Sequence, residues 1–317
     1  MKEIGGYFEL ESDYIDNSYH KKAIALNTAT NGLIYLIKSK NIKKIYLPYY
    51  LCDCLEKIKP YCLVEYYKIN KDFTPSFNVE LKDNEYLYII NYFGIFDNYA
   101  IKKYKKIYKN IIIDNVQAFF QRPVKGIDTI YSCRKFFGVP DGAYLYTDCL
   151  LNHEIPIDKS KNRFMHLLGR LEEDASTNYN LYKENEELLS KLELAYMSKA
   201  TKTILNNIKY NLVRNKRTEN FNYLNEHLNN INKLKINSIS GAYAYPLYLE
   251  KNVQIRKRLI ENKIYIPILW PNVLTENNED SIEYKYANNI LPIPCDQRYG
   301  IEDMKKIIKL IIGEKNT

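Results

Sequence analysis

The chain has 317 residues, of which 46% are hydrophobic and 26% are charged. These ordinary fractions exclude wholesale disorder and collagen-like or coiled-coil structure, and the length favours about two domains. The formal net charge of +8 is mild for this length, so it permits anionic substrates without being typical of a nucleic-acid-binding protein.

Apolar runs such as Ile111–Ile113 are far too short to span a membrane. The N-terminal sequence MKEIGGYFELESDY has acidic residues and no apolar core, so we expect no signal peptide. The six cysteines include no C-x-x-C pair, which favours reduced thiols in a cytoplasmic protein. We expect no metal site, because Cys52 and Cys54 lack a second close pair of ligands.

The first half of the chain alternates short apolar runs with helix-like segments. Runs rich in Ile, Tyr and Val predict strands at 23–27, 44–48, 64–69, 86–92, 110–114, 128–132 and 143–147. Several are apolar on both faces, as strands inside a mostly parallel sheet are. Helices are predicted between them at 31–39, 53–58 and 99–108. This alternation predicts an α/β layered domain.

After about residue 155 the pattern becomes helical. Phe221, Leu224, Leu228 and Ile231 recur at helical spacing and predict one apolar stripe. The nearby charges, Arg217 among them, are expected to face solvent. A smaller mixed segment follows, with strands at 244–249 and 290–294 and helices at 254–262 and 301–312. We place a domain boundary near residue 200, giving domains 1–200 and 201–317.

A turn of small polar residues, Asn27–Gly32, joins the first strand to the first helix. Small residues there leave backbone N–H groups free at the helix N-terminus, where the helix dipole favours an anion. The alternative is that a Thr or Asn in this turn simply caps the helix.

Asp114 ends a buried strand, and Gln117 follows three residues later. A carboxylate in such a place is costly unless it is paired, so it is suited to face a cationic ring nitrogen. A helix cap for the next segment fits the same residues.

Lys135 follows the strand at 128–132 directly, beside Arg134. Desolvation or a cationic neighbour lowers the pKa of a lysine, and the neutral amine can act as a nucleophile or a general base. A tight turn at 138–143 then leads into another strand. A lone lysine usually lies on the surface, so its interpretation depends on these neighbouring features.

In this order, the features resemble the DegT-like aminotransferases, the sugar aminotransferase family among the fold-type I enzymes that use pyridoxal 5'-phosphate (PLP). The resemblance extends from Ala23 to Ile308. It rests on the segments LNTATNGL, PYYLCD, DNVQ, SCRK, VPDGA and ILPIPCDQRYGIEDM. It implies a mostly parallel central sheet with helices on both faces, plus a smaller C-terminal α/β domain.

The resemblance also implies a cofactor site for PLP. The implied cofactor-binding residues are Ala29, Thr30, Tyr50, Cys52, Asp114, Gln117, Ser132 and Lys135. Lys135 would form the Schiff base, and Asp114 would pair with the ring nitrogen, so these two are the implied catalytic residues. The ring-stacking position falls on Cys52, with Tyr50 close by. The spacing from Ser132 to Lys135 is two residues shorter than in the commonest family pattern.

The resemblance implies an aminotransferase that moves an amino group from L-glutamate to a keto-sugar. It also implies that the protein is a homodimer. The product would serve surface polysaccharide or glycoconjugate synthesis, and the resemblance leaves open whether the acceptor carries a nucleotide. We expect Arg134, Trp270 and Arg298 to bind substrate. Trp270 follows the strand-like segment IYIPIL, and core packing for Trp270 or a surface ion pair for Arg298 are the alternatives. A PLP-dependent decarboxylase or lyase, or a non-catalytic regulatory protein of this fold, stays open.

Overall fold

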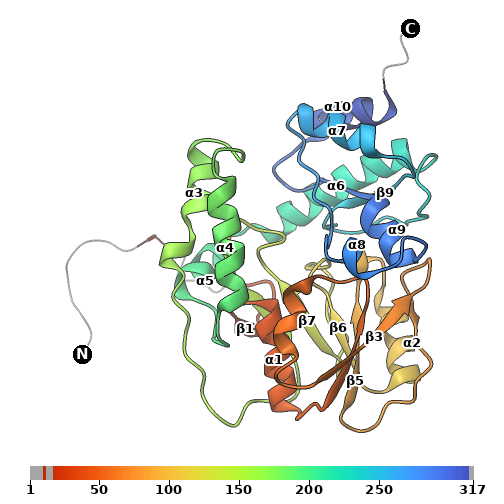
Figure 1. Ribbon diagram of the computed structural model, residues 1–317. Coiled ribbons are helices and arrows are strands. Elements are labelled where there is room, and N and C mark those ends of the chain that lie inside the picture. The colour runs from red at the N-terminus through yellow and green to blue at the C-terminus, as the bar shows by residue number, and fades with distance from the viewer. Residues whose placement is uncertain (1–9, 12–16, 314–317) are drawn as a thin grey trace.

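A computed structural model describes residues 10–11 and 17–313 (Figure 1). The N-terminal sequence expected to lack a signal peptide therefore lies outside the described residues, apart from residues 10 and 11. Within the described part, the large sheet has eight strands in the order β1-β8-β7-β6-β5-β2-β3-β4. These strands are β1 Ile24–Leu26, β2 Lys44–Pro48, β3 Leu63–Ile69, β4 Pro75–Ser76, β5 Glu85–Ile90, β6 Ile111–Asp114, β7 Asp128–Ser132 and β8 Ala143–Tyr146.

The centre of this sheet is parallel. Strands β3, β2, β5, β6 and β7 run parallel to one another, whereas β4 pairs antiparallel with β3, β8 with β7, and β1 with β8. The prediction of a mostly parallel sheet is therefore confirmed. Because parallel strands end at one edge, Asp114 at the end of β6 and Ser132 at the end of β7 lie at the same edge, where ligands of such sheets bind.

Helices follow the strands closely in the first half. α1 begins directly after Thr28, whose hydroxyl accepts a hydrogen bond from the Asn31 N–H at 3.1 Å and so caps the helix. α1 packs on β7 and β8, and α2 packs on β6. The elements of this half are α1 Ala29–Ser39, η1 Asp53–Ile58, η2 Tyr92–Gly94 and α2 Asn98–Tyr108, of which η1 and η2 are 3₁₀ helices.

The second half supplies most of the helices and a small sheet. In Figure 1, α3 and α4 stand side by side as a hairpin, and α6, α7 and α10 gather above the large sheet. Strands β9 Tyr245–Tyr248 and β10 Ile290–Ile293 pair antiparallel. The helices are η3 Lys161–Arg163, α3 Met165–Glu172, α4 Tyr179–Lys191, α5 Lys199–Asn206, α6 Tyr210–Leu228, α7 Val253–Glu261, α8 Val273–Glu276, α9 Ile282–Asn289 and α10 Ile301–Ile312. None of the described helices is long and apolar enough to cross a membrane.

The apolar stripe predicted on α6 is largely confirmed. Phe221, Leu224 and Leu228 are fully buried in a core that α6 shares with α10 and the small sheet. Ile231 lies beyond the end of α6 and is exposed. Residues of the C-terminal part, such as Val273, also pack into the core of the large sheet, and the domain boundary near residue 200 stays a prediction.

Two expectations from the sequence are wrong. The segment IYIPIL before Trp270 forms no strand, because its alternating pattern has no partner strand and its proline cannot donate to one. The thiols are not all reduced, because Cys52 and Cys54 form a disulfide across Cα atoms 5.3 Å apart. This distance is normal for a disulfide and follows from the turn into η1. The predicted cytoplasmic location rested partly on reduced thiols and stays a prediction.

Arg217 on α6 is buried, where the sequence predicts a solvated side chain. Its guanidinium donates to the carbonyl oxygens of Phe136 and Ala242, at 3.0 and 2.9 Å, and to Oε1 of Gln297 at 2.7 Å. It forms no ion pair with another described residue, and burial lowers its pKa. Arg217 therefore joins the segment after Lys135 to two parts of the C-terminal half.

We expect Arg217→Met to destabilise the protein by about 3 kcal/mol, because the carbonyl oxygens of Ala242 and Tyr243 and Oε1 of Gln297 lose the arginine donor at about 1 kcal/mol or more each. The Phe136 carbonyl keeps a second donor, Nε2 of Gln297. Urea unfolding of the cofactor-free protein measures the loss. Lys216→Met is the matched control on the same helix: it removes only an exposed pair with Glu219, worth less than about 1 kcal/mol. Equal losses in the two variants would contradict this account of Arg217.

Candidate active site

Asp114 lies at the carboxyl end of β6, in register with Ile90 of β5 and Ile130 of β7. Its carboxylate is buried and accepts hydrogen bonds from the Tyr88 hydroxyl at 2.7 Å and the Val116 N–H at 2.8 Å. Desolvation raises the pKa of Asp114 to about 6 in spite of these donors and of the Lys135 cation. The site therefore favours a further positive charge near this carboxylate.

Gln117 is buried one turn beyond Asp114. Its Oε1 accepts a hydrogen bond from the Phe93 N–H at 2.7 Å, while its Nε2 has no partner among the described residues. An orphaned donor of this kind is costly inside a protein unless a ligand accepts from it.

Lys135 is partly exposed and follows β7 by three residues. Desolvation, and after it the Arg134 cation, lowers its pKa to about 8, while Asp114 and Glu186 act in the opposite direction. Its Nζ lies 5.6 Å from the centre of the Tyr243 ring. A substantial fraction of the amine is thus neutral near pH 8 and able to act as a nucleophile or base.

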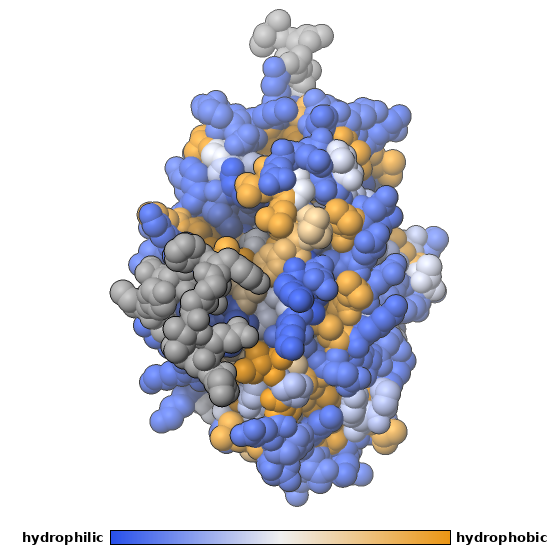
Figure 2. Space-filling model, turned by 90° about the vertical axis from the view of Figure 1, so that its left-hand side faces the viewer, coloured by the Kyte–Doolittle hydropathy of each residue, from blue (hydrophilic) through white to orange (hydrophobic). Residues whose placement is uncertain are grey.

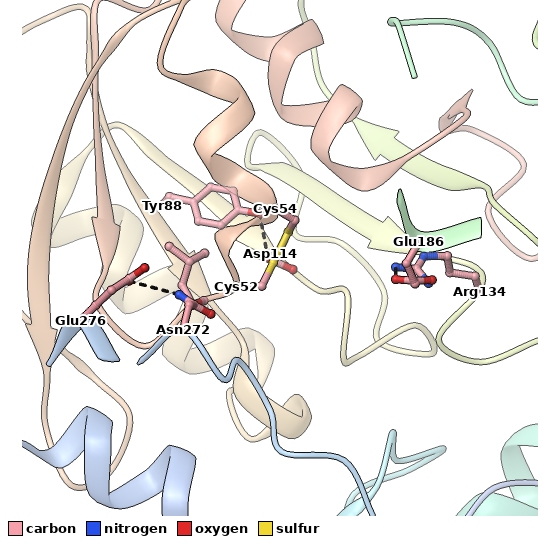
Figure 3. The surroundings of a disulfide bond; sticks show 9 residues. Cys52, Cys54, Tyr88, Asp114, Arg134, Glu186, Asn272 and Glu276 are labelled. Carbon is pink, nitrogen blue, oxygen red and sulfur yellow. Dashed lines mark hydrogen bonds and ion pairs between the residues drawn. A yellow bond between two sulfur atoms is a disulfide. The ribbon is translucent and has the colours of Figure 1, made fainter. Parts of the chain in front are cut away.

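Arg134 forms a two-pronged ion pair with Glu186 of α4, in which Nη2 and Oε2 are 2.7 Å apart. Figure 3 shows the two side chains facing each other, with the Tyr88–Asp114 pair and the disulfide in the same view. About a third of each side chain is exposed. Arg134, predicted to bind substrate, therefore has a carboxylate partner within the chain.

The predicted anion site lies at the start of α1. Thr28 takes the capping role, and the N–H groups of Ala29 and Thr30 donate to no described residue. Gly142 connects this turn to the lysine segment, because its N–H donates to Asn27 and its carbonyl accepts from Cys133. The φ of Gly142 is +103°, and a Cβ there would come within 3.0 Å of Thr201, so this connection requires glycine.

Ser132 completes the same edge of the sheet. It ends β7 and is buried, and its hydroxyl makes no hydrogen bond to another described side chain or backbone group. Two free N–H groups at a helix N-terminus and a nearby hydroxyl are the donors that a phosphate needs.

Tyr50 and Cys52 are the residues for which the resemblance implies contact with the cofactor ring, and this role stays a prediction. Tyr50 is fully buried, stacked on Tyr92 at 5.2 Å and edge-on to Trp270 at 4.6 Å. Cys52 is partly exposed and offers one sulfur of the disulfide with Cys54, not a thiol.

Trp270 and Arg298, the other two residues predicted to bind substrate, make their contacts with residues other than Lys135. Trp270 packs edge-on against Tyr50 and Tyr92, with a positive φ of 59°. Arg298 pairs with Asp296 two residues away and is half exposed. Their substrate-binding roles stay predictions.

Sequence reasoning missed Tyr88, Glu186 and Tyr243. Tyr88 had a signal, because a buried acid needs donors and Tyr88 lies on the strand beside β6. Glu186 and Tyr243 had none, because they reach the site from helix and loop segments distant in sequence. The described residues contain no group of three or more potential metal ligands.

No family model matches the sequence, and the search of curated proteins finds no match. Solved structures are similar over most of the chain. A DegT/DnrJ/EryC1/StrS aminotransferase from Brucella abortus aligns with a TM-score of 0.61 at 13% identity, covering 93% of this chain and 86% of its own. NtdA from Bacillus subtilis with bound PMP aligns with a TM-score of 0.62 at 12% identity, covering 92% and 72%.

A third structure is a dehydratase. GDP-4-keto-6-deoxy-D-mannose-3-dehydratase from E. coli, with bound hydrated PLP, aligns with a TM-score of 0.57 at 12% identity, covering 91% of this chain and 87% of that chain. The mixed α/β architecture with a large central sheet is common to all three. The chain therefore has the fold of the DegT-like sugar aminotransferases, as its sequence predicts.

Proposed function

We propose that the protein is a PLP-dependent aminotransferase. One observation carries the proposal: Asp114 and Lys135 lie at the ends of neighbouring strands with pKa values shifted toward each other, to about 6 and about 8. Such opposed shifts at one strand edge are typical of catalytic sites. The names of the similar structures, including an aminotransferase and two structures with bound PMP or PLP, support the same conclusion.

The residues present fit the cofactor. The unpaired Nε2 of Gln117 is a donor for the ring hydroxyl, and the buried Asp114 carboxylate favours a protonated ring nitrogen. The free N–H groups of Ala29 and Thr30 and the Ser132 hydroxyl suit the phosphate. Lys135 would hold PLP covalently. Tyr50 and Cys52 stay candidates for contact with the ring.

The chain's own residues then divide the work. When bound, PLP supplies an electron sink for the carbon that loses a proton. The neutral amine of Lys135 takes that proton at Nζ and returns it to a second carbon. Asp114 holds positive charge on its side of the site, and Tyr88 and Val116 fix the direction of its carboxylate. Phe93 fixes Gln117 in the same way.

For the substrates, we propose L-glutamate as amino donor and a keto-sugar as acceptor. The similarity to the E. coli dehydratase, whose name gives a nucleotide-linked keto-sugar as its substrate, supports this class of acceptor. A role in surface polysaccharide or glycoconjugate synthesis is part of the same proposal. A PLP-dependent decarboxylase or lyase is the second candidate, because one similar structure is a dehydratase.

We also propose a homodimer. The α3–α4 hairpin exposes Leu168, Leu171 and Leu188, and Figure 2, which looks onto the side of the molecule where the hairpin stands, shows apolar patches among hydrophilic ones. Exposed apolar patches are typical of interaction surfaces. We expect light scattering to give twice the chain mass, and Leu171→Lys, at 81% exposure, to shift the protein toward monomer. A monomeric wild-type protein would contradict this.

We expect the purified protein loaded with PLP to be yellow, and borohydride to fix the cofactor on the peptide that contains Lys135. Addition of L-glutamate should then convert the yellow form into the pyridoxamine form, which a decarboxylase or lyase does not accumulate. Absorption spectra and peptide mass spectrometry provide the readout. Label on another lysine would refute the assignment of Lys135, and an unchanged spectrum with glutamate would refute glutamate as donor.

We expect Asp114→Asn to slow transamination by several kcal/mol of barrier, at about 1.36 kcal/mol per tenfold. The same change should stabilise the cofactor-free protein. The pKa of Asp114 is about 6 in the folded protein, against 3.8 for the free side chain. The protonated carboxyl group therefore adds to the stability of the folded protein at low pH, and this contribution is lost as the pH rises from about 4 to 6.

Above that window the ionised carboxylate costs about 3 kcal/mol, which asparagine avoids. Urea unfolding at pH 4 and pH 8 tests this: the variant should gain at pH 8 and gain little at pH 4. Equal gains at both values would show that desolvation of the carboxylate is not the cause. Near-normal turnover would refute the catalytic role.

A further inference from the structure

The Arg134–Glu186 pair connects the residue next to Lys135 to a helix 52 residues away. Both oxygens of Glu186 meet the guanidinium, so the pair has the fork-to-fork geometry with which arginine recognises a carboxylate. With about a third of each side chain exposed, the pair can be reached from solvent. Pairs of this exposure contribute little net stability.

α4 is otherwise tied weakly to the lysine segment. Asn185 and Leu189 are its buried residues, and the rest of the helix is partly or fully exposed. The Asn185 side chain donates to the Pro140 carbonyl at 3.0 Å, and its own Oδ1 has no partner. Tyr182 of the same helix also hydrogen-bonds with the Arg134 side chain. Three residues, Tyr182, Asn185 and Glu186, therefore make polar contacts of α4 with the segment 134–140.

Glu186 also acts on the catalytic amine. Its charge raises the pKa of Lys135, whereas the charge of Arg134 lowers it. The carboxylate of Glu186 is therefore within electrostatic range of Nζ. It occupies the place beside Lys135 where an anionic group of a substrate would be held by Arg134.

We propose that Glu186 occupies a binding site for a substrate carboxylate on Arg134. The carboxylate of the amino donor displaces Glu186 and pairs with Arg134, and α4 then loses one of its contacts with the segment 134–140. This inference rests on the proposed function. It extends it by naming the anchor of the donor and the part of the fold that responds to its binding.

The donor class follows from the order of two residues. An α-amino acid carries its amine and its carboxylate on one carbon, and Lys135 and Arg134 are adjacent in the chain. The charge of Arg134 lowers the pKa of Lys135, so the two cations also lie close in space, and a donor whose amine reaches Lys135 can present its carboxylate to Arg134. Exchange of one carboxylate for another keeps the charge and the geometry of the pair, and a donor held in the site competes at a high effective concentration.

The test uses cofactor-free full-length protein and calorimetric titration with glutarate, a carboxylate probe, at constant ionic strength. Glu186→Gln leaves Arg134 without its anion, so we expect glutarate to bind at least about fivefold more tightly than to the wild type. Glu187→Gln is the matched control, because Glu187 is the next residue on α4 and is exposed. It should leave glutarate binding unchanged. Adding Arg134→Gln to Glu186→Gln should abolish the gain.

A second measurement follows the helix itself. Hydrogen exchange in 179–191 should rise when glutarate saturates the wild-type protein, and should already be high in Glu186→Gln. Inorganic phosphate is titrated in parallel as a second anion. Only phosphate binding that is lost with Arg134→Gln is compared with the binding of glutarate.

Three results would overturn the inference: no gain with Glu186→Gln, a gain that survives loss of Arg134, or a gain for phosphate alone. None of these measurements uses PLP. A protein that fails to bind PLP but passes them loses the proposed function and keeps the carboxylate anchor, whereas a working transaminase that fails them loses this inference alone.

Discussion

Desolvation of one carboxylate is the constraint on which the rest of the site depends. Asp114 receives hydrogen bonds from Tyr88 and Val116, yet its pKa remains raised. The two donors therefore do not offset the loss of water, and the edge of the sheet retains a demand for positive charge. Lys135 supplies this positive charge only in part, because desolvation of its own amine and the Arg134 cation favour the neutral form. A cationic group held by Asp114 would compensate the desolvated carboxylate while Lys135 stays neutral.

The segment that carries Lys135 is short and irregular, and its shape comes from its surroundings. Gly142 joins it to the turn before α1, Asn185 holds the Pro140 carbonyl, and Arg217 holds the Phe136 carbonyl. Each contact comes from a different part of the chain. These contacts hold the loop on both sides of Lys135, and precise positioning of a functional group requires such support.

Much of the large sheet could be predicted because its information is local. The runs that form β2 and β7 predict those strands to the residue. Polar residues at the ends of β6 and β7, Asp114 and Ser132, indicate the edge that carries the candidate site. The sequence gives no local sign of contacts between residues that are far apart in the chain. In the sequence, Arg217 cannot be told from an exposed charged residue on an amphipathic helix. Trp270 shows the opposite error, since a strand-like pattern precedes it where no partner strand exists.

Arg217 has a consequence for the order in which the protein is assembled. Its four acceptors lie at residues 136, 242, 243 and 297, so the last of them leaves the ribosome long after the large sheet has been synthesised. Domains fold as units during translation, earlier ones first. The large sheet can form on the nascent chain, but the loop that holds Lys135 gains its final shape only after the C-terminal half has been made. Competence to take up a cofactor therefore requires residues of the C-terminal half as well as the large sheet.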